Sequence, residues 1–223
     1  MSQELFFSFL YTIAFAVILA TGEVLHSILK VKTEYTRKFA HSTASLLSLT
    51  FPLIYDSYEY VLVMGALFFV LLLLAQHRHL LLSINDVSRK TYGGILLPVA
   101  VAGSFTVSVL LNDVRLFIIP VLLLGVSDSL AGITGYYFGE RVRKIIIYKL
   151  QLNKTYLGST VFFLTSVVIS AYALYWITGS YNDKTFVTAF TVAAAAAIVE
   201  AFSSRGFDNF TVPLTALMIL LVL

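Results

Sequence analysis

The chain has 223 residues, of which 59% are hydrophobic and 12% are charged. Soluble domains carry about 25% charged residues, so the composition excludes an ordinary soluble domain and predicts an integral membrane protein in the lipid bilayer. The absence of cysteine excludes disulfides, thiolate nucleophiles and cysteine-based metal sites. Because no linker, charge run or repeat divides the chain, we expect one domain covering residues 1–223.

The apolar stretches predict an all-α fold, a polytopic transmembrane bundle of seven or eight helices, because about 20 apolar residues are needed to span a bilayer. The first stretch lacks a basic leader and a small-residue cleavage pattern, so we expect a retained helix and not a signal peptide. The last stretch is short enough that we expect it to cross only part of the membrane or to pack inside the bundle. The helices are expected near residues 6–29, 39–55, 60–77, 93–111, 116–138, 157–178, 185–203 and 212–223.

The basic residues are distributed unevenly over the predicted loops. Among the 15 lysines and arginines, only Arg115 and Lys184 fall on one face of the predicted bundle, and the other thirteen fall on the opposite face. The positive-inside rule places the face with thirteen basic residues in the cytoplasm and the N-terminus outside.

Asp128 lies about midway along the apolar stretch 116–138 and is followed by a glycine stripe, Gly132, Gly135 and Gly139. A carboxylate at this depth opposes membrane insertion by roughly 2.5–3.5 kcal/mol, which makes it a candidate functional residue. The spacings of four, three and four residues place Asp128 and the glycines near one helix face, where another backbone or a ligand can approach closely. The structural alternative is a tight helix–helix contact with a paired Asp128.

Two further segments carry cations at the expected cytoplasmic face. Arg37, Lys38 and His41 share a face of the second predicted helix, and two cations beside a histidine suit an anionic group such as phosphate. Arg89 and Lys90 precede a Gly-Gly turn at a helix start, where free backbone N–H groups and the helix dipole favour anions. For the first segment the structural alternative is a membrane anchor with an interfacial histidine. For the second segment it is an ordinary charged loop with a turn.

The segment NKTYLGST begins the helix predicted at 157–178. Lys154, Thr155, Gly158 and Ser159 could cradle a phosphate through a cation, backbone amides and hydroxyls. The order of these residues differs from that of a P-loop, in which the glycines come first. The structural alternative is a helix N-terminus capped by Asn153 or Ser159.

Acidic residues approach the same face from the last two predicted helices. Glu200 ends one helix, Gly206 is expected to break it, and Asp208 and Asn209 begin the next apolar run. Because Mg²⁺ is held by one or two carboxylates together with substrate phosphates, Asp128, Glu200 and Asp208 are candidate metal ligands and Asn209 a candidate nucleotide contact.

A purely structural interpretation of this connection is also open. In that interpretation Asn209 or Thr211 caps the last helix, and Glu200 forms an ion pair with Arg205.

Four segments in this order resemble the membrane-embedded CTP-dependent lipid-alcohol kinases, which include dolichol (polyprenol) kinase, phytol kinase and the fungal-type diacylglycerol kinase. The segments are RKFAH, DSLAGITGYYFG, KTYLGS and E-x-x-S-S-R-G-x-D-N-x-T-x-P, and they extend from Arg37 to Pro213. The family is distantly related to the phosphatidate cytidylyltransferases. Their carboxy-terminal signature is absent here, which favours phosphoryl transfer over cytidylyl transfer.

The resemblance implies transfer of the γ-phosphate of CTP to the hydroxyl of an isoprenoid alcohol of the dolichol or polyprenol type, with Mg²⁺ as cofactor. We expect Asp128, His41 and Lys154 to act in catalysis, in the cell membrane of a prokaryote and at its cytoplasmic face. No nucleic acid partner is expected. The oligomeric state, the tail length of the alcohol and the base that activates it stay open.

Phytol, geranylgeraniol and diacylglycerol are the alternative acceptors, and a phosphatidate cytidylyltransferase is the alternative enzyme. The non-enzymatic alternative is a small transporter, in which a buried Asp128 and broken helices would serve a substrate path. A transporter would spread its polar groups over both membrane faces, whereas these gather on one.

Overall fold

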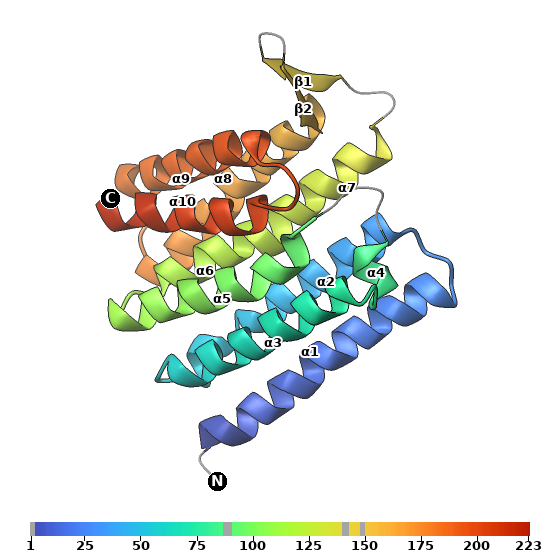
Figure 1. Cartoon of the computed structure of the whole chain (residues 1–223). Helices are drawn as coiled ribbons and strands as arrows, with labels where there is room; N and C mark the ends of the chain where they lie inside the picture. The colour runs from blue at the N-terminus through green and yellow to red at the C-terminus, as the bar shows by residue number, and fades with distance from the viewer. Residues whose placement is uncertain (1–2, 87–90, 140–142, 148–149) are drawn as a thin grey trace.

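The computed structural model describes residues 3–86, 91–139, 143–147 and 150–223, and it confirms an all-α helical bundle (Figure 1). A small antiparallel hairpin of two strands precedes α8, in a segment predicted to be a loop. The elements follow the order α1 (Gln3–Ser27), α2 (Thr33–Ser48), the 3₁₀ turn η1 (Phe51–Leu53), α3 (Glu59–His77), α4 (Leu82–Asn85), α5 (Gly93–Leu110), α6 (Arg115–Leu122), the π-helical turn η2 (Leu123–Asp128), α7 (Ser129–Tyr137), β1 (Lys144–Ile147), β2 (Leu150–Thr155), α8 (Tyr156–Thr178), α9 (Asp183–Phe202) and α10 (Asp208–Val222).

Six helical segments within the described residues are long and apolar enough to cross a membrane. They are α1, α3, α5, the continuous stretch α6–η2–α7, α8 and α9. The last helix, α10, is shorter, as expected for a helix that crosses the bilayer only in part. These apolar helices indicate an integral membrane protein.

The helix predicted at 39–55 is wrong at both ends. α2 begins at Thr33 and ends at Ser48, so Arg37 and Lys38, which the predicted bounds leave in a loop, belong to its first turns. Pro52 follows in η1 and has no backbone N–H with which to continue the α-helical hydrogen bonds, so α2 does not extend to residue 55. α2 is therefore a short helix with many polar residues, and it is not among the six candidate spans.

α10 also begins earlier than expected, at Asp208 and not at residue 212. Gly206 has a φ of 84° and turns the chain between α9 and α10, which confirms it as the break between these helices. A side chain at Gly206 would collide with the backbone of Gly93, so this turn packs directly against the start of α5. Asp208 and Asn209 consequently lie in the first turn of α10, facing the interior.

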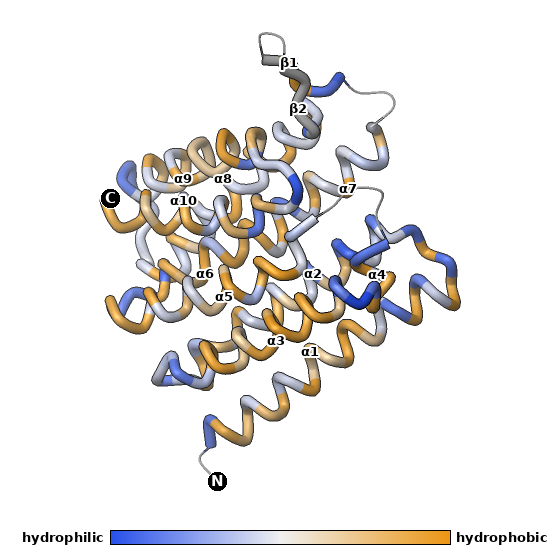
Figure 2. The backbone as a smooth tube through the Cα atoms, viewed as in Figure 1, coloured by the Kyte–Doolittle hydropathy of each residue, from blue (hydrophilic) through white to orange (hydrophobic). Residues whose placement is uncertain are grey.

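Two hydrophobic cores hold the bundle together, and the α6–η2–α7 stretch lies between them (Figure 1). One core joins α6 to α8, α9 and α10 around Phe162 and Val192. The other is aromatic and joins α1, η1, α3, α5 and α6 around Phe51, Phe105 and Phe117. Figure 2 shows apolar residues along the helix bodies and hydrophilic stretches in the connections near α4 and at the α9–α10 turn. The polar interior between the two cores is therefore the place where a site can form.

Candidate functional site

Asp128 is the last residue of the π-helical turn η2, a feature that occurs often at functional sites. The side chains of α2 bind backbone carbonyl groups in this turn. His41 Nε2 donates to the carbonyl of Leu124 at 3.1 Å, and Ser42 Oγ donates to the carbonyl of Gly125 at 2.7 Å. α2 therefore holds in place the turn that carries Asp128.

Gly125 and Pro120 are the sequence signals for this turn. Pro120 has no backbone N–H and interrupts the helical hydrogen-bond ladder one turn before η2. A Cβ on Gly125 would lie 2.7 Å from Cβ of Ser45, so only a glycine lets α2 pack this closely. The hydropathy pattern alone predicts one regular helix over residues 116–138, and the π-helical turn corrects this prediction.

The carboxylate of Asp128 is buried and paired with the ammonium group of Lys38 from α2. The ammonium also donates to the backbone carbonyl of Asp128 at 3.2 Å. A Cβ on Gly132 would lie 2.5 Å from Cε of Lys38, which shows that the lysine side chain passes directly over this glycine. Gly132 thus makes room for a side chain from α2 at the predicted glycine stripe.

Lys154 lies between two carboxylates from α9 and α10. Its Nζ is 2.5 Å from Oε1 of Glu200 and 2.7 Å from Oδ2 of Asp208. Ser159 of α8 donates to the other oxygen of Glu200 at 3.1 Å. The structural alternative that paired Glu200 with Arg205 is therefore wrong, since Lys154 takes that place.

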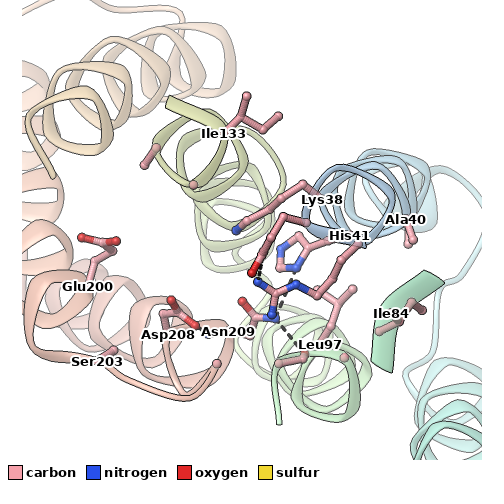
Figure 3. A pocket seen from close by; sticks show the side chains of 18 of the residues that line it. Lys38, Ala40, His41, Ile84, Leu97, Ile133, Glu200, Ser203, Asp208 and Asn209 are labelled. Carbon is pink, nitrogen blue, oxygen red and sulfur yellow. Dashed lines mark hydrogen bonds and ion pairs between the residues drawn. The ribbon is translucent and has the colours of Figure 1, made fainter. Parts of the chain in front are cut away.

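The structure brings together the three acids that the sequence analysis proposed as metal ligands. One carboxylate oxygen each from Asp128, Glu200 and Asp208 lies within 4.8 Å of the others, and all three residues are buried. Figure 3 shows Glu200 and Asp208 facing Lys38 and His41 across the pocket. Such a set of hard oxygen donors fits a divalent cation of the Mg²⁺ type.

The charge of Lys154 is stabilised by its surroundings. Burial by itself would lower the pKa of Lys154, but the carboxylates of Asp208, Glu200 and Asp128 outweigh burial and raise the pKa above its ordinary value. Lys154 is therefore a permanent cation at neutral pH, next to the acids.

His41 is bound to protein groups through both ring nitrogens. Nε2 donates to Leu124 as described, and Nδ1 accepts a hydrogen bond from Nδ2 of Asn209 at 3.2 Å. This pattern requires the neutral tautomer with hydrogen on Nε2. Asn209 also donates to the carbonyl of Gly93 at 2.7 Å, so it joins α10 to α2 and α5. In this arrangement His41 and Asn209 position the helices around Asp128, and Asn209 is not the helix cap that the structural alternative expected.

Thr155 is the N-cap of α8, a role that the structural alternative gave to Asn153 or Ser159. Its Oγ1 accepts from the amide of Gly158 at 3.1 Å, so this amide is not free to bind a phosphate here. A Cβ on Gly158 would meet the carbonyl of Ala131 at 3.2 Å, and a Cβ on Gly135 would meet Oγ1 of Thr155 at 3.2 Å. Both glycines serve the close contact between α7 and α8 beside the pocket.

The remaining predicted phosphate contacts are placed as follows. Arg37 lines the pocket, with Nη2 paired to Glu34 at 2.6 Å and Nη1 donating to Thr91 at 3.3 Å. Arg89 and Lys90 lie outside the described residues. One end of a cavity of about 1030 Å³ is lined by the acids Glu200 and Asp208 and by the cations Arg37, Lys38 and Lys154, and the cavity continues between α1, α2, α3 and α5.

The chain is similar to a curated phytol kinase from Synechocystis sp. The two are 27% identical over 208 residues, which cover 92% of this chain and 85% of that protein. No protein-family model matches the chain, and no solved structure matches it. The similarity supports a family of the phytol or polyprenol kinase type and, with the buried charged site, a kinase that acts on a lipid alcohol.

Proposed function

We propose that the protein transfers the γ-phosphate of CTP to the hydroxyl of an isoprenoid alcohol dissolved in the membrane. The proposal rests on a buried cluster of charged side chains, in which the carboxylates of Asp128, Glu200 and Asp208 lie close together and pair with Lys38 and Lys154. This cluster lies at the polar end of a cavity that continues between apolar helices. A hydrophilic phosphate donor and a lipid acceptor need this combination of surroundings in one place.

Phosphoryl transfer depends mainly on positioning and on stabilising charge at the transferred group. In the proposed reaction the hydroxyl oxygen forms a bond to the γ-phosphorus, the bond between this phosphorus and the bridging oxygen breaks, and CDP leaves. The hydroxyl proton passes to a carboxylate of the site. Lys154 remains charged at neutral pH and Arg37 lines the same cavity, so both suit the phosphate oxygens.

Asp128, Glu200 and Asp208 are the residues that would hold Mg²⁺. When bound, the ion would neutralise charge on the phosphates of the nucleotide. These residues suit a divalent cation because the three buried carboxylates are only partly neutralised by Lys38 and Lys154. Mutual repulsion among three ionised acids is costly without further positive charge, and a divalent ion supplies it.

The identity of the donor as CTP rests on the resemblance of the four sequence segments to the CTP-dependent kinases. The isoprenoid nature of the acceptor rests on the same resemblance and on the similarity to a phytol kinase. The proposed cytoplasmic position of the site rests on the uneven distribution of basic residues and the positive-inside rule.

The experiment is a transfer assay with purified protein, phytol, geranylgeraniol, polyprenols, diacylglycerol and phosphatidate, each offered with CTP carrying a radiolabel on either the α- or the γ-phosphate. We expect label from the γ-position in the lipid product and none from the α-position. Label from the α-position would identify a cytidylyltransferase instead. ATP, GTP and UTP in parallel reactions test the donor, and an Asp128→Asn variant is the control for contaminating kinases.

A further inference from the structure

Beyond the charged site, the cavity extends between four helices as an apolar space that the transfer chemistry does not use. We call this part the tail compartment, and its walls come from α1, α2 with η1, α3 and α5. Representative lining residues are Phe15, Ala44, Phe51, Met64, Phe68 and Val101.

The lining residues of α3 follow a single face of that helix. Val61, Met64, Phe68 and Leu72 recur at spacings of three and four residues, so they form one stripe that points into the bundle. α3 itself carries no lysine or arginine. The compartment is therefore apolar along its whole length on this side, as a hydrocarbon chain requires.

The far end of the compartment is closed by a fixed aromatic wall. Phe51 and Val61 are each 1% exposed there. The Phe51 ring packs edge-on against Tyr11 and Phe105, with ring centroids 5.0 and 5.9 Å away, and stacks on Phe117 at 6.1 Å. A wall held by ring contacts on several sides cannot retreat without loss of packing, because protein interiors are close-packed.

The depth of the compartment follows from the helix that lines it. Val61 at the closed end and Leu72 towards the charged site are eleven positions apart on α3, which corresponds to roughly 16 Å at 1.5 Å per residue. This depth is about half of the hydrocarbon core of a bilayer, which is about 30 Å thick.

We propose that the tail compartment binds the hydrocarbon tail of the acceptor alcohol, and that its closed end at Phe51 sets an upper limit on the tail length. The inference rests on the proposed function for the identity of the acceptor. Continuity of the cavity places the hydroxyl at the charged end lined by Lys38, Lys154 and Asp208 when the tail lies along α3. The compartment therefore selects alcohols of the size of farnesol, geranylgeraniol or phytol over long polyprenols.

Ala44 offers a direct test, because it lines the cavity one turn beyond His41, between the charged site and Phe51. Ala44→Phe shortens the compartment. We expect the ratio of the phosphorylation rate of geraniol to that of geranylgeraniol to rise at least about tenfold in this variant, a change of about 1.4 kcal/mol in relative barrier. The matched control is Ala66→Phe, since Ala66 is exposed on α3 and does not line the cavity.

An unchanged ratio in Ala44→Phe, with the melting temperature of the wild type, overturns the inference. Efficient phosphorylation of long polyprenols by the wild type, at the rate found for geranylgeraniol, also overturns the length limit. Either result leaves the kinase activity itself intact, so the two proposals fail separately.

A readout that needs no catalysis is photo-crosslinking with a diazirine-bearing farnesol analogue in the absence of nucleotide. Mass spectrometry should place the label on lining residues such as Phe15, Met64 and Phe68, and Ala44→Phe should reduce it while Ala66→Phe does not. Labelling confined to lipid-facing residues such as Val63, which is exposed on α3, overturns the inference whether or not the protein proves to be a kinase.

Discussion

Lys38 reaches the carboxylate of Asp128 by crossing the bare backbone of Gly132. The lysine belongs to α2 and the aspartate to the end of η2, so this contact joins two elements that are 90 residues apart in the chain. A glycine one turn after Asp128 is what permits the crossing, because a methyl group there would occupy the path of the lysine side chain.

Gly132→Ala should therefore displace Lys38 without disturbing the rest of the bundle. The added Cβ would lie 2.5 Å from Cε of Lys38, and this atom belongs to a flexible side chain that can move away. We expect activity to fall by about tenfold or more, and the melting temperature to fall as well, because the displaced lysine leaves the buried carboxylate of Asp128 without its partner. The matched control is Gly103→Ala on α5, where an added Cβ meets no described atom within 4 Å and activity should be unchanged.

The helices could be predicted from the sequence because length and hydropathy alone determine which segments can cross a bilayer. The bounds of α2 could not, since its polar residues face an internal site and mimic those of a loop. The π-helical turn at Asp128 was missed for a related reason. Its hydrogen bonds come from side chains of α2, and sequence periodicity within residues 116–138 carries no information about them.

The gathering of Asp128, Glu200 and Asp208 was a correct expectation from topology, because helices that start and end at the same face bring their termini together. The pairing within the site was not predictable. Lys38 and Lys154 both looked like phosphate ligands in the sequence, whereas in the structure each is an ion-pair partner of an acid. Which cation meets which acid depends on the rotation of each helix, which sequence spacing leaves undetermined.

Asp128→Asn should lower activity more than about tenfold, which is a barrier change of about 1.4 kcal/mol. It should also destabilise the protein, because removing one partner of a buried ion pair costs about 3–5 kcal/mol. The double variant Asp128→Asn/Lys38→Met removes both charges, so we expect it to regain most of the lost stability and none of the activity. Unfolding in a detergent of fixed composition, measured beside the transfer assay, separates the two effects. A double variant as unstable as the single one would contradict the loss of the ion pair as the cause of the destabilisation.

Lys154 should stay charged throughout the pH range in which the enzyme can be assayed. Its pKa is raised in the folded state, so its stabilising contribution is fully present below the ordinary value of 10.5 and is lost only as the pH rises through the folded-state pKa. The difference in melting temperature between the wild type and Lys154→Gln should therefore stay constant from about pH 6 to about pH 9. Lys154→Gln should also weaken CTP binding more than alcohol binding, because only the nucleotide is multiply charged. A difference in melting temperature that shrinks between pH 7 and pH 9 would mean that Lys154 loses its proton in this range.

Glu200→Gln should raise the Mg²⁺ concentration needed for half-maximal activity. Glu200 is 2% exposed and offers an oxygen within 4.8 Å of those of Asp128 and Asp208, so its replacement removes one carboxylate from the cluster. Asp208→Asn should act in the same direction, whereas Asp183→Asn, an exposed change at the opposite end of α9, should leave the Mg²⁺ requirement unchanged. The measurement is a Mg²⁺ titration of the transfer rate at a fixed concentration of CTP.

Because Glu200 also pairs with Lys154, the titration is repeated with Lys154→Gln. If that variant shifts the Mg²⁺ requirement as much as Glu200→Gln does, the ion pair and not metal coordination accounts for the effect, and Glu200 then acts by holding Lys154 in place.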